Sequence, residues 1–247
     1  MKKNIFTEIL RYESIDSTQI KAKNLAEKNS SEGTVIIAQR QTQGYGRMRS
    51  NWSSEIGGLW FSFILRPNIY ADEVVQIAPL IGAALHKVFE KELKIKTKIK
   101  WPNDILFNGK KVAGIIAEMP VDENKVKWVA AGVGINVNNV LDGEIKNTAQ
   151  SLKDITGKEV CAETVFQSFL TEFSAIYLDF LKSGFKIFVD KYNKETAFLN
   201  SQVVITNGGE KSVGVYKGID ENANLLLMTK DGLKKFISGT LRPYLPD

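Results

Sequence analysis

Apolar residues along the chain fall into two kinds of pattern, one with helical spacing and one with strand spacing. Three long helices are expected. The first, over about 16–28, is predicted because Asp16-Ser17-Thr18 fits a helix N-cap. The second and third, over about 72–92 and 162–182, are predicted because their apolar side chains recur every three or four residues, and a shorter helix is expected over 185–198. Pro79 should kink or restart the second helix, and Gly184 should end the third.

Shorter apolar runs predict strands near 34–40, 58–66 and 126–137. Asn108-Gly109 separates two further runs, and this dipeptide is a strong signal for a two-residue hairpin turn. Lysines alternate with apolar residues and a threonine over 94–101, which predicts a strand with all its lysines on one face. That face fits a solvated sheet edge and equally a docking surface for an acidic or phosphate-bearing partner.

The pattern changes after Asn200 to short β segments separated by turns rich in asparagine, aspartate and glycine. Their spacing predicts a small antiparallel barrel of about 45 residues. We therefore expect an α+β domain over 1–199 and a small β domain over 200–247.

Composition limits the kinds of catalytic and metal site that the chain can form. The chain has 247 residues, enough for a large core, and it contains only one cysteine and one histidine. The single cysteine excludes an intramolecular disulfide and fits a reducing cytoplasm. A zinc cluster of cysteines and histidines is excluded, and a Ser-His-Asp triad would need His86, which lies within a helical pattern. No apolar run reaches the roughly 18 residues that span a bilayer. We expect a carboxylate to supply any general base.

The segment over 41–52, QTQGYGRMRSNW, lies between two predicted strands, and we call it the cationic loop. Gly44 and Gly46 leave its backbone open, while Arg47 and Arg49 give it positive charge without a nearby acid. Trp52 adds a flat surface on which a ring can stack. The loop is suited to close over a nucleotide-like anion, although alone it fits a solvated basic hairpin equally well. The dinucleotide fingerprint lacks its third glycine here, and the P-loop pattern is absent.

Four further motifs accompany the cationic loop: DSTQ over 16–19, KWPND over 100–104, GKKVAG over 109–114 and GVGIN over 132–136. In this order and spacing the five motifs resemble the biotin–protein ligases, from about Tyr12 to the C-terminus. The KWPND and GKKVAGI segments discriminate best. The resemblance implies a mixed sheet flanked by helices, like class II synthetase catalytic domains, and an SH3-like C-terminal β-barrel.

The resemblance also implies a two-step reaction with ATP and biotin as substrates and Mg²⁺ as the accompanying ion. Biotin is first activated to biotinyl-5′-AMP and then transferred to a lysine of a biotin carboxyl carrier domain. The implied catalytic residues are Arg47, Asp104 and Lys111, and Asp104 is a candidate for contact with Mg²⁺. The implied biotin-binding residues are Ser17, Thr18, Gln19, Gln41, Tyr45, Gly46, Arg47, Lys111, Gly114, Gly132 and Gly134. The implied nucleotide-binding residues are Arg47, Trp52, Asn103, Lys111 and Asn136.

The cationic loop departs from the family pattern G-R-G-R-x-G-R-x-W at three positions. Tyr45 replaces the first arginine, Arg49 replaces a glycine and Ser50 replaces the last arginine. Because the central Arg47 remains, we expect adenylate formation. The altered charge of the loop should affect how well the protein retains the biotinyl-5′-AMP intermediate. The ligase-like region begins about a dozen residues into the chain. We therefore expect the enzyme-only form, with no DNA-binding domain and no membrane partner, and leave homodimer formation open.

Three alternatives remain. A lipoate or octanoate ligase of related fold would show an R-R-x-S-G-G-G-x-V-x-H-D segment, which this chain lacks. A basic nucleic-acid-binding protein fits the net charge of +5 and the lysine-faced strand, but few aromatic residues interleave with the lysines. A degenerate ligase that only binds biotin fits poorly with the presence of Arg47, Asp104 and Lys111.

Overall fold

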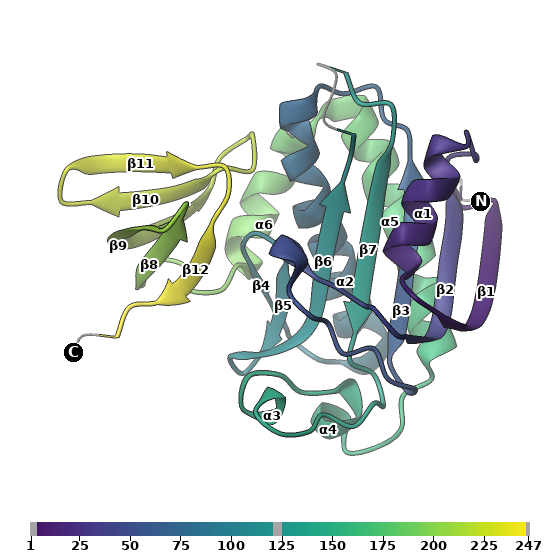
Figure 1. Cartoon of the computed structure of the whole chain (residues 1–247). Helices are drawn as coiled ribbons and strands as arrows, with labels where there is room; N and C mark the ends of the chain where they lie inside the picture. The colour runs from purple at the N-terminus through teal and green to yellow at the C-terminus, as the bar shows by residue number, and fades with distance from the viewer. Residues whose placement is uncertain (1–3, 121–124, 246–247) are drawn as a thin grey trace.

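A seven-stranded mixed sheet forms the main body, and a separate five-stranded sheet lies beside it (Figure 1). This computed structural model describes residues 4–120 and 125–245. The large sheet has the order β1-β2-β3-β7-β6-β5-β4, in which only the β1–β2 pair is parallel. Its strands are β1 (Glu8–Ile15), β2 (Thr34–Gln41), β3 (Leu59–Leu65), β4 (Lys98–Lys100), β5 (Asp104–Phe107), β6 (Lys110–Glu118) and β7 (Val129–Ile135).

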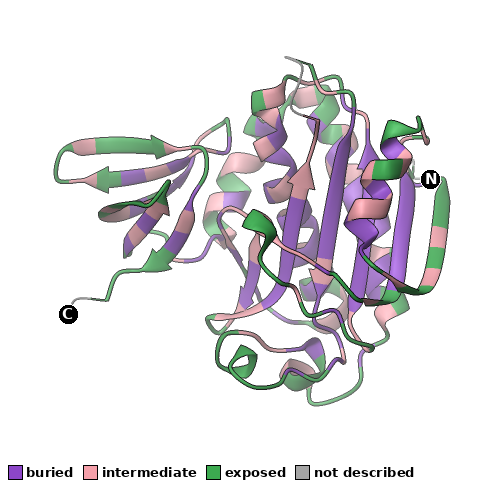
Figure 2. Ribbon diagram, viewed as in Figure 1, coloured by how far each residue is buried: buried purple, intermediate pink, exposed green. Residues whose placement is uncertain are grey.

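Helices cover both faces of this sheet, because its central strands are apolar on both sides. Helix α1 (Thr18–Glu27) packs on β2, β3 and β7, and helices α2 (Ile77–Leu93) and α5 (Ala162–Ser183) pack on each other across the opposite face (Figure 1). Ile36 and Ile64 belong to the core under α1, whereas Val35 and Phe63 belong to the core under α2 and α5. The central strands are accordingly buried along most of their length (Figure 2). They provide a rigid floor for side chains at their ends.

Local signals in the sequence explain where these elements begin and end. The side chain of Ser17 caps α1 by accepting a hydrogen bond from the amide of Ile20, as expected. Pro79 lies in the first turn of α2, which restarts after a 3-10 turn, so the predicted restart is confirmed. Asn108 and Gly109 have φ angles of 48° and 80° and form the β5–β6 hairpin. The remaining helical segments are α3 (Ile145–Thr148), α4 (Leu152–Thr156), α6 (Val189–Glu195) and 3-10 turns at Arg47–Arg49, Ala71–Gln76 and Phe185–Phe188.

Two features of the large sheet differ from the prediction. Strand β1 was not predicted, because it is an edge strand with mostly exposed residues and no apolar alternation (Figure 2). The lysine-bearing segment is a strand only over Lys98–Lys100, because Lys94 instead caps α2 with a φ of 60°. The alternation itself is confirmed: Ile95 and Thr97 are buried, while Lys94, Lys96 and Lys98 are exposed.

The second sheet is antiparallel with the order β11-β10-β9-β8-β12, which confirms the small β domain predicted after Asn200. It packs against the main body near the KWPND turn, where the Trp101 indole donates a 3.0 Å hydrogen bond to the carbonyl of Ala223. The same region buries a contact of 3.2 Å between the Thr196 and Tyr216 hydroxyls. Among the described residues, no helix is both long and apolar enough to cross a bilayer. The strands of this second sheet are β8 (Gln202–Asn207), β9 (Glu210–Ile219), β10 (Leu225–Thr229), β11 (Gly232–Phe236) and β12 (Thr240–Pro243).

Candidate active site

A cavity of about 440 Å³ lies where the cationic loop crosses one face of β6 and β7. Its walls come from this loop, the start of α1, the KWPND turn and the first residues of β12, so segments far apart in the chain meet there. All but one of the predicted site residues line it. These are Ser17, Thr18, Gln19, Gln41, Tyr45, Gly46, Arg47, Trp52, Asn103, Asp104, Lys111, Gly114, Gly132 and Gly134.

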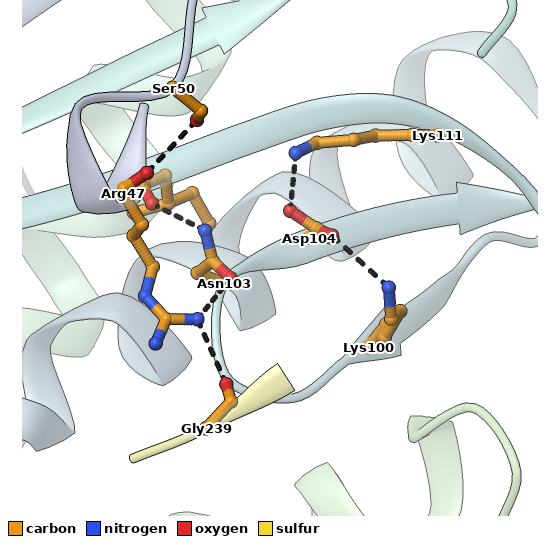
Figure 3. Close-up of polar contacts among 8 residues, drawn as sticks. Arg47, Ser50, Lys100, Asn103, Asp104, Lys111 and Gly239 are labelled. Atoms are coloured by element: carbon orange, nitrogen blue, oxygen red, sulfur yellow. Dashed lines mark hydrogen bonds and ion pairs between the residues drawn. The ribbon is translucent and has the colours of Figure 1, made fainter. Parts of the chain in front are cut away.

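A carboxylate between two lysines forms one wall of the cavity (Figure 3). Lys111 Nζ lies 2.6 Å from Asp104 Oδ1, and Lys100 Nζ lies 3.5 Å from Asp104 Oδ2. The strand register places Asp104 opposite Lys100 on β4 and opposite Gly114 on β6, the strand that also carries Lys111. Two cations against one carboxylate leave a net positive charge here. This wall is therefore suited to bind an anion.

Arg47 joins the cationic loop to two other parts of the molecule. Its Nη1 donates to Asn103 Oδ1 at 3.3 Å and to the Gly239 carbonyl at 3.2 Å, both drawn in Figure 3. Asn103 is itself fixed, since its Nδ2 donates to the Ile115 carbonyl at 3.0 Å. Burial lowers the pKa of Arg47, and the charge of Asp104 acts in the opposite direction. The guanidinium nevertheless stays protonated and supplies a further fixed cation to the cavity.

A polar pocket occupies the end of the cavity near α1. The Gln41 Oε1 accepts hydrogen bonds from the amide of Thr18 at 2.8 Å and from its hydroxyl at 3.0 Å. The same hydroxyl lies 2.9 Å from Ser62 Oγ. Ser62 was not predicted, although a single serine inside the apolar run of β3 was a visible signal. Buried hydroxyl and amide groups in this arrangement can satisfy the donors and acceptors of a small polar ring.

Small residues on β6 and β7 let Trp52 lie flat against the sheet. A Cβ at Gly134 would be 2.6 Å from Trp52 Nε1, and one at Gly114 would be 2.8 Å from Trp52 Cζ3. Lys111 Nζ lies 4.7 Å from the centre of the indole ring, a cation–π contact. The indole nitrogen is buried and has no hydrogen-bond partner among the described residues. The predicted stacking of Trp52 near an adenine stays a prediction.

Asn136 is the predicted site residue that does not line the cavity. It is buried, and its Oδ1 accepts a 3.2 Å hydrogen bond from Asn139. Its assignment to nucleotide binding stays a prediction. The sequence interpretation missed lining residues that only the fold brings in, because nothing local marks a second-sheet segment as part of the site. They include Thr240, Leu241 and Arg242 of β12. Lys100 and Pro102 also line the cavity; they belong to the KWPND motif, but the sequence interpretation gave them no role.

The donor groups at Asp104 do not fit a magnesium ion held by the protein. Both carboxylate oxygens face lysine ammonium groups. Across residues 4–120 and 125–245, no cluster of three or more His, Cys, Asp or Glu side chains gathers in a way that could hold a metal. Mg²⁺ prefers several oxygen ligands and commonly arrives bound to substrate phosphates.

Comparisons with known proteins agree with this geometry. Residues 12–136 match the model of the Biotin/lipoate A/B protein ligase family, and residues 198–240 match that of the Biotin protein ligase C terminal domain. The chain is 38% identical to the bifunctional ligase/repressor BirA of Bacillus subtilis, over 94% of this chain and 73% of that protein. It is 29% identical to the biotin–[acetyl-CoA-carboxylase] ligase of Paracoccus denitrificans, over 86% of this chain and 90% of that protein.

Its fold also matches a solved structure, that of the biotin protein ligase from Aquifex aeolicus in complex with biotin and ATP. The TM-score is 0.86 at 33% identity, and the match covers 97% of this chain and all of the other. The two domain matches agree with the five sequence motifs and with the cavity that these motifs form. The chain belongs to the biotin protein ligase family.

Proposed function

We propose that this chain is an ATP-dependent ligase that activates biotin and attaches it to a lysine of an acceptor protein. One observation carries the proposal: a single cavity combines fixed cations, a carboxylate and a buried polar pocket. The cations suit the phosphates of ATP and the carboxylate of biotin. The polar pocket suits the ureido ring, whose carbonyl accepts and whose two N–H groups donate.

In the first step, an oxygen of the biotin carboxylate attacks the α-phosphorus of ATP. The new C–O–P linkage is a mixed anhydride, and the bond between the α- and β-phosphates breaks to release pyrophosphate. Both reactants are anionic, so fixed positive charge lowers the barrier most where charge develops. We assign this role to Arg47 of the cationic loop and Lys111 of β6, which both line the cavity. Mg²⁺ enters as part of the MgATP substrate.

In the second step, the amine of the acceptor lysine attacks the acyl carbon of biotinyl-5′-AMP. An amide bond forms, the acyl–phosphate bond breaks, and AMP and a proton leave. We assign Asp104 to orient or deprotonate the amine, since it is the carboxylate in the cavity wall. The anhydride must be kept from water until the amine arrives. The cationic loop, held over the cavity by Arg47, is placed to do this.

The acceptor we propose is a biotin carboxyl carrier domain of a carboxylase, because the relative from Paracoccus denitrificans is a biotin–[acetyl-CoA-carboxylase] ligase. Other expectations stay predictions: action in a cytoplasm, absence of DNA binding and a domain boundary near residue 200. The nucleic-acid alternative is less favoured, because Lys98 and Lys100 of the lysine-bearing strand lie near carboxylates. The lipoate ligase alternative is less favoured, because the C-terminal match is to biotin protein ligases.

The direct test supplies purified chain with MgATP, a carrier domain and either labelled biotin or labelled lipoate. We expect label on the carrier lysine with biotin only, and none when ATP is omitted. Transfer of lipoate in preference to biotin would replace the proposed function by its alternative. A carrier with its target lysine changed to arginine controls for nonspecific labelling.

A further inference from the structure

One carboxylate just outside the cavity, Glu118, binds two side chains, Tyr45 and Gln19, that line its polar end. Glu118, at the end of β6, accepts a 2.8 Å hydrogen bond at Oε2 from the hydroxyl of Tyr45. The same oxygen accepts a 2.9 Å hydrogen bond from Gln19 Nε2, on α1. Lys23 Nζ lies 3.5 Å from the other oxygen. Glu118 therefore ties the cationic loop, α1 and β6 together.

These contacts fix the orientation of the Gln19 amide. Its Nε2 also donates to the Ala130 carbonyl at 2.9 Å, and since both partners are acceptors the oxygen must face the other way. Gln19 Oε1 is buried against Gly132, where an added Cβ would lie 2.7 Å away, and no described residue donates to it. The side chain is 3% exposed and lines the cavity. A buried acceptor without a donor is costly, and a ligand N–H would relieve that cost.

Tyr45 is held from both sides. Its hydroxyl binds Glu118, and the guanidinium of Arg49 lies 4.3 Å from the centre of its ring. Burial, and then Glu118, raise the pKa of Tyr45, so the phenol remains a donor at neutral pH. Burial alone would raise the pKa of Glu118, but hydrogen bonds from Gln19 and Tyr45 outweigh it and lower that pKa. Both partners thus keep the charge states that the hydrogen bond needs.

We propose that Tyr45, Glu118 and Gln19 form a relay that couples closure of the cationic loop to recognition of a ligand N–H. The loop positions Glu118 through Tyr45, and Glu118 holds the amide of Gln19 so that its oxygen can accept. The inference rests on the proposed function, because the ureido ring of biotin offers N–H donors and the dithiolane ring of lipoate offers none. Tyr45 and Glu118 are positioning residues, and Gln19 discriminates between ligands.

The test is Tyr45→Phe, which removes the hydroxyl and keeps the ring under Arg49. We expect the KM for biotin in the adenylation step to rise about 3- to 10-fold, the effect of losing a partly exposed hydrogen bond to a charged group. The KM for ATP should stay within about twofold, because the relay lies at the opposite end of the cavity from the lysine wall. Tyr12→Phe is the matched control, since that phenol also has a cation near its ring, Lys21 at 6.0 Å, but does not line the cavity.

A double-mutant cycle separates a relay from independent contacts. We expect Glu118→Gln to raise the KM for biotin, and the double variant with Tyr45→Phe to be less impaired than the product of the two single effects. Provided that the wild type is active, two results would overturn the relay. One is an equal increase in the KM for biotin and the KM for ATP; the other is an effect of the double variant equal to the product of the two single effects. A wild type that forms no biotinyl-AMP would instead overturn the proposed function, and this inference with it. Thermal unfolding of each variant near the wild-type midpoint establishes that folding is intact.

Discussion

Replacing Lys111 by methionine removes one ammonium group from the cavity and keeps most of the side-chain volume. In the structure this ammonium lies 2.6 Å from Asp104 and 4.7 Å from the centre of the Trp52 ring. Asp104 would keep a second cation, since Lys100 lies 3.5 Å from its other oxygen. The substitution should therefore change ligand chemistry more than stability.

The size of the effect follows from the loss of the charge-assisted contact that we propose between Lys111 and the anionic ligand. A charge-assisted hydrogen bond contributes about 1.5–3 kcal/mol, which corresponds to a roughly 10- to 150-fold loss in kcat/KM for adenylation. Lys110 is adjacent in sequence but donates to the Lys146 carbonyl at 2.8 Å, and it does not line the cavity. Lys110→Met is thus the matched control, with an expected change of less than about twofold.

The assay is release of pyrophosphate from MgATP in the presence of biotin, before any acceptor is added. We expect Lys111→Met to be slowed as above and Lys110→Met to match the wild type. Release at the wild-type rate by Lys111→Met would remove Lys111 from the role proposed for it. Equal loss in both variants would indicate a general effect of charge in this hairpin.

Three further perturbations test other parts of the site. Arg47→Gly loses the contact to Gly239 and one fixed cation, so biotinyl-AMP should dissociate about tenfold faster. The released biotinyl-AMP should label lysines of a noncarrier protein, which blotting measures, and unchanged labelling would contradict this. Gly134→Ala would place a Cβ 2.6 Å from Trp52 and force the indole to shift at about 1–3 kcal/mol, so calorimetry should find weaker ligand binding. Burial lowers the pKa of His86, so the unfolded state binds more protons and stability should fall as pH drops below about 6.5; chemical denaturation should show a flatter pH profile for His86→Gln.

Periodicity and turn chemistry predicted most of the architecture, because those signals are local. The serine cap of α1, the Asn108-Gly109 hairpin and the glycine that ends α5 each act within a few residues. Strand β1 escaped prediction because pairing with β2, rather than its own composition, makes it a strand. The β domain was predicted by its spacing.

The candidate site was predicted less completely. Motif resemblance named residues that the fold brings to one cavity, but the contacts among them depend on strand register and on packing between the two sheets. The lysine pair around Asp104 follows from the β4–β5–β6 register, and the Arg47 contact to Gly239 joins positions 192 residues apart. The resemblance named Tyr45 as a biotin-binding residue, although Tyr45 also departs from the family pattern. Its partner Glu118 lies 73 residues away, beyond the reach of any local signal.

The central claim is that this cavity makes an acyl-adenylate and holds it. Native mass spectrometry of the chain after incubation with biotin and MgATP, without an acceptor, tests it most directly. The account predicts a noncovalent complex with the mass of biotinyl-5′-AMP, which disappears when a carrier domain is added and its lysine becomes biotinylated. Folded protein that shows no such complex and releases no pyrophosphate would contradict it.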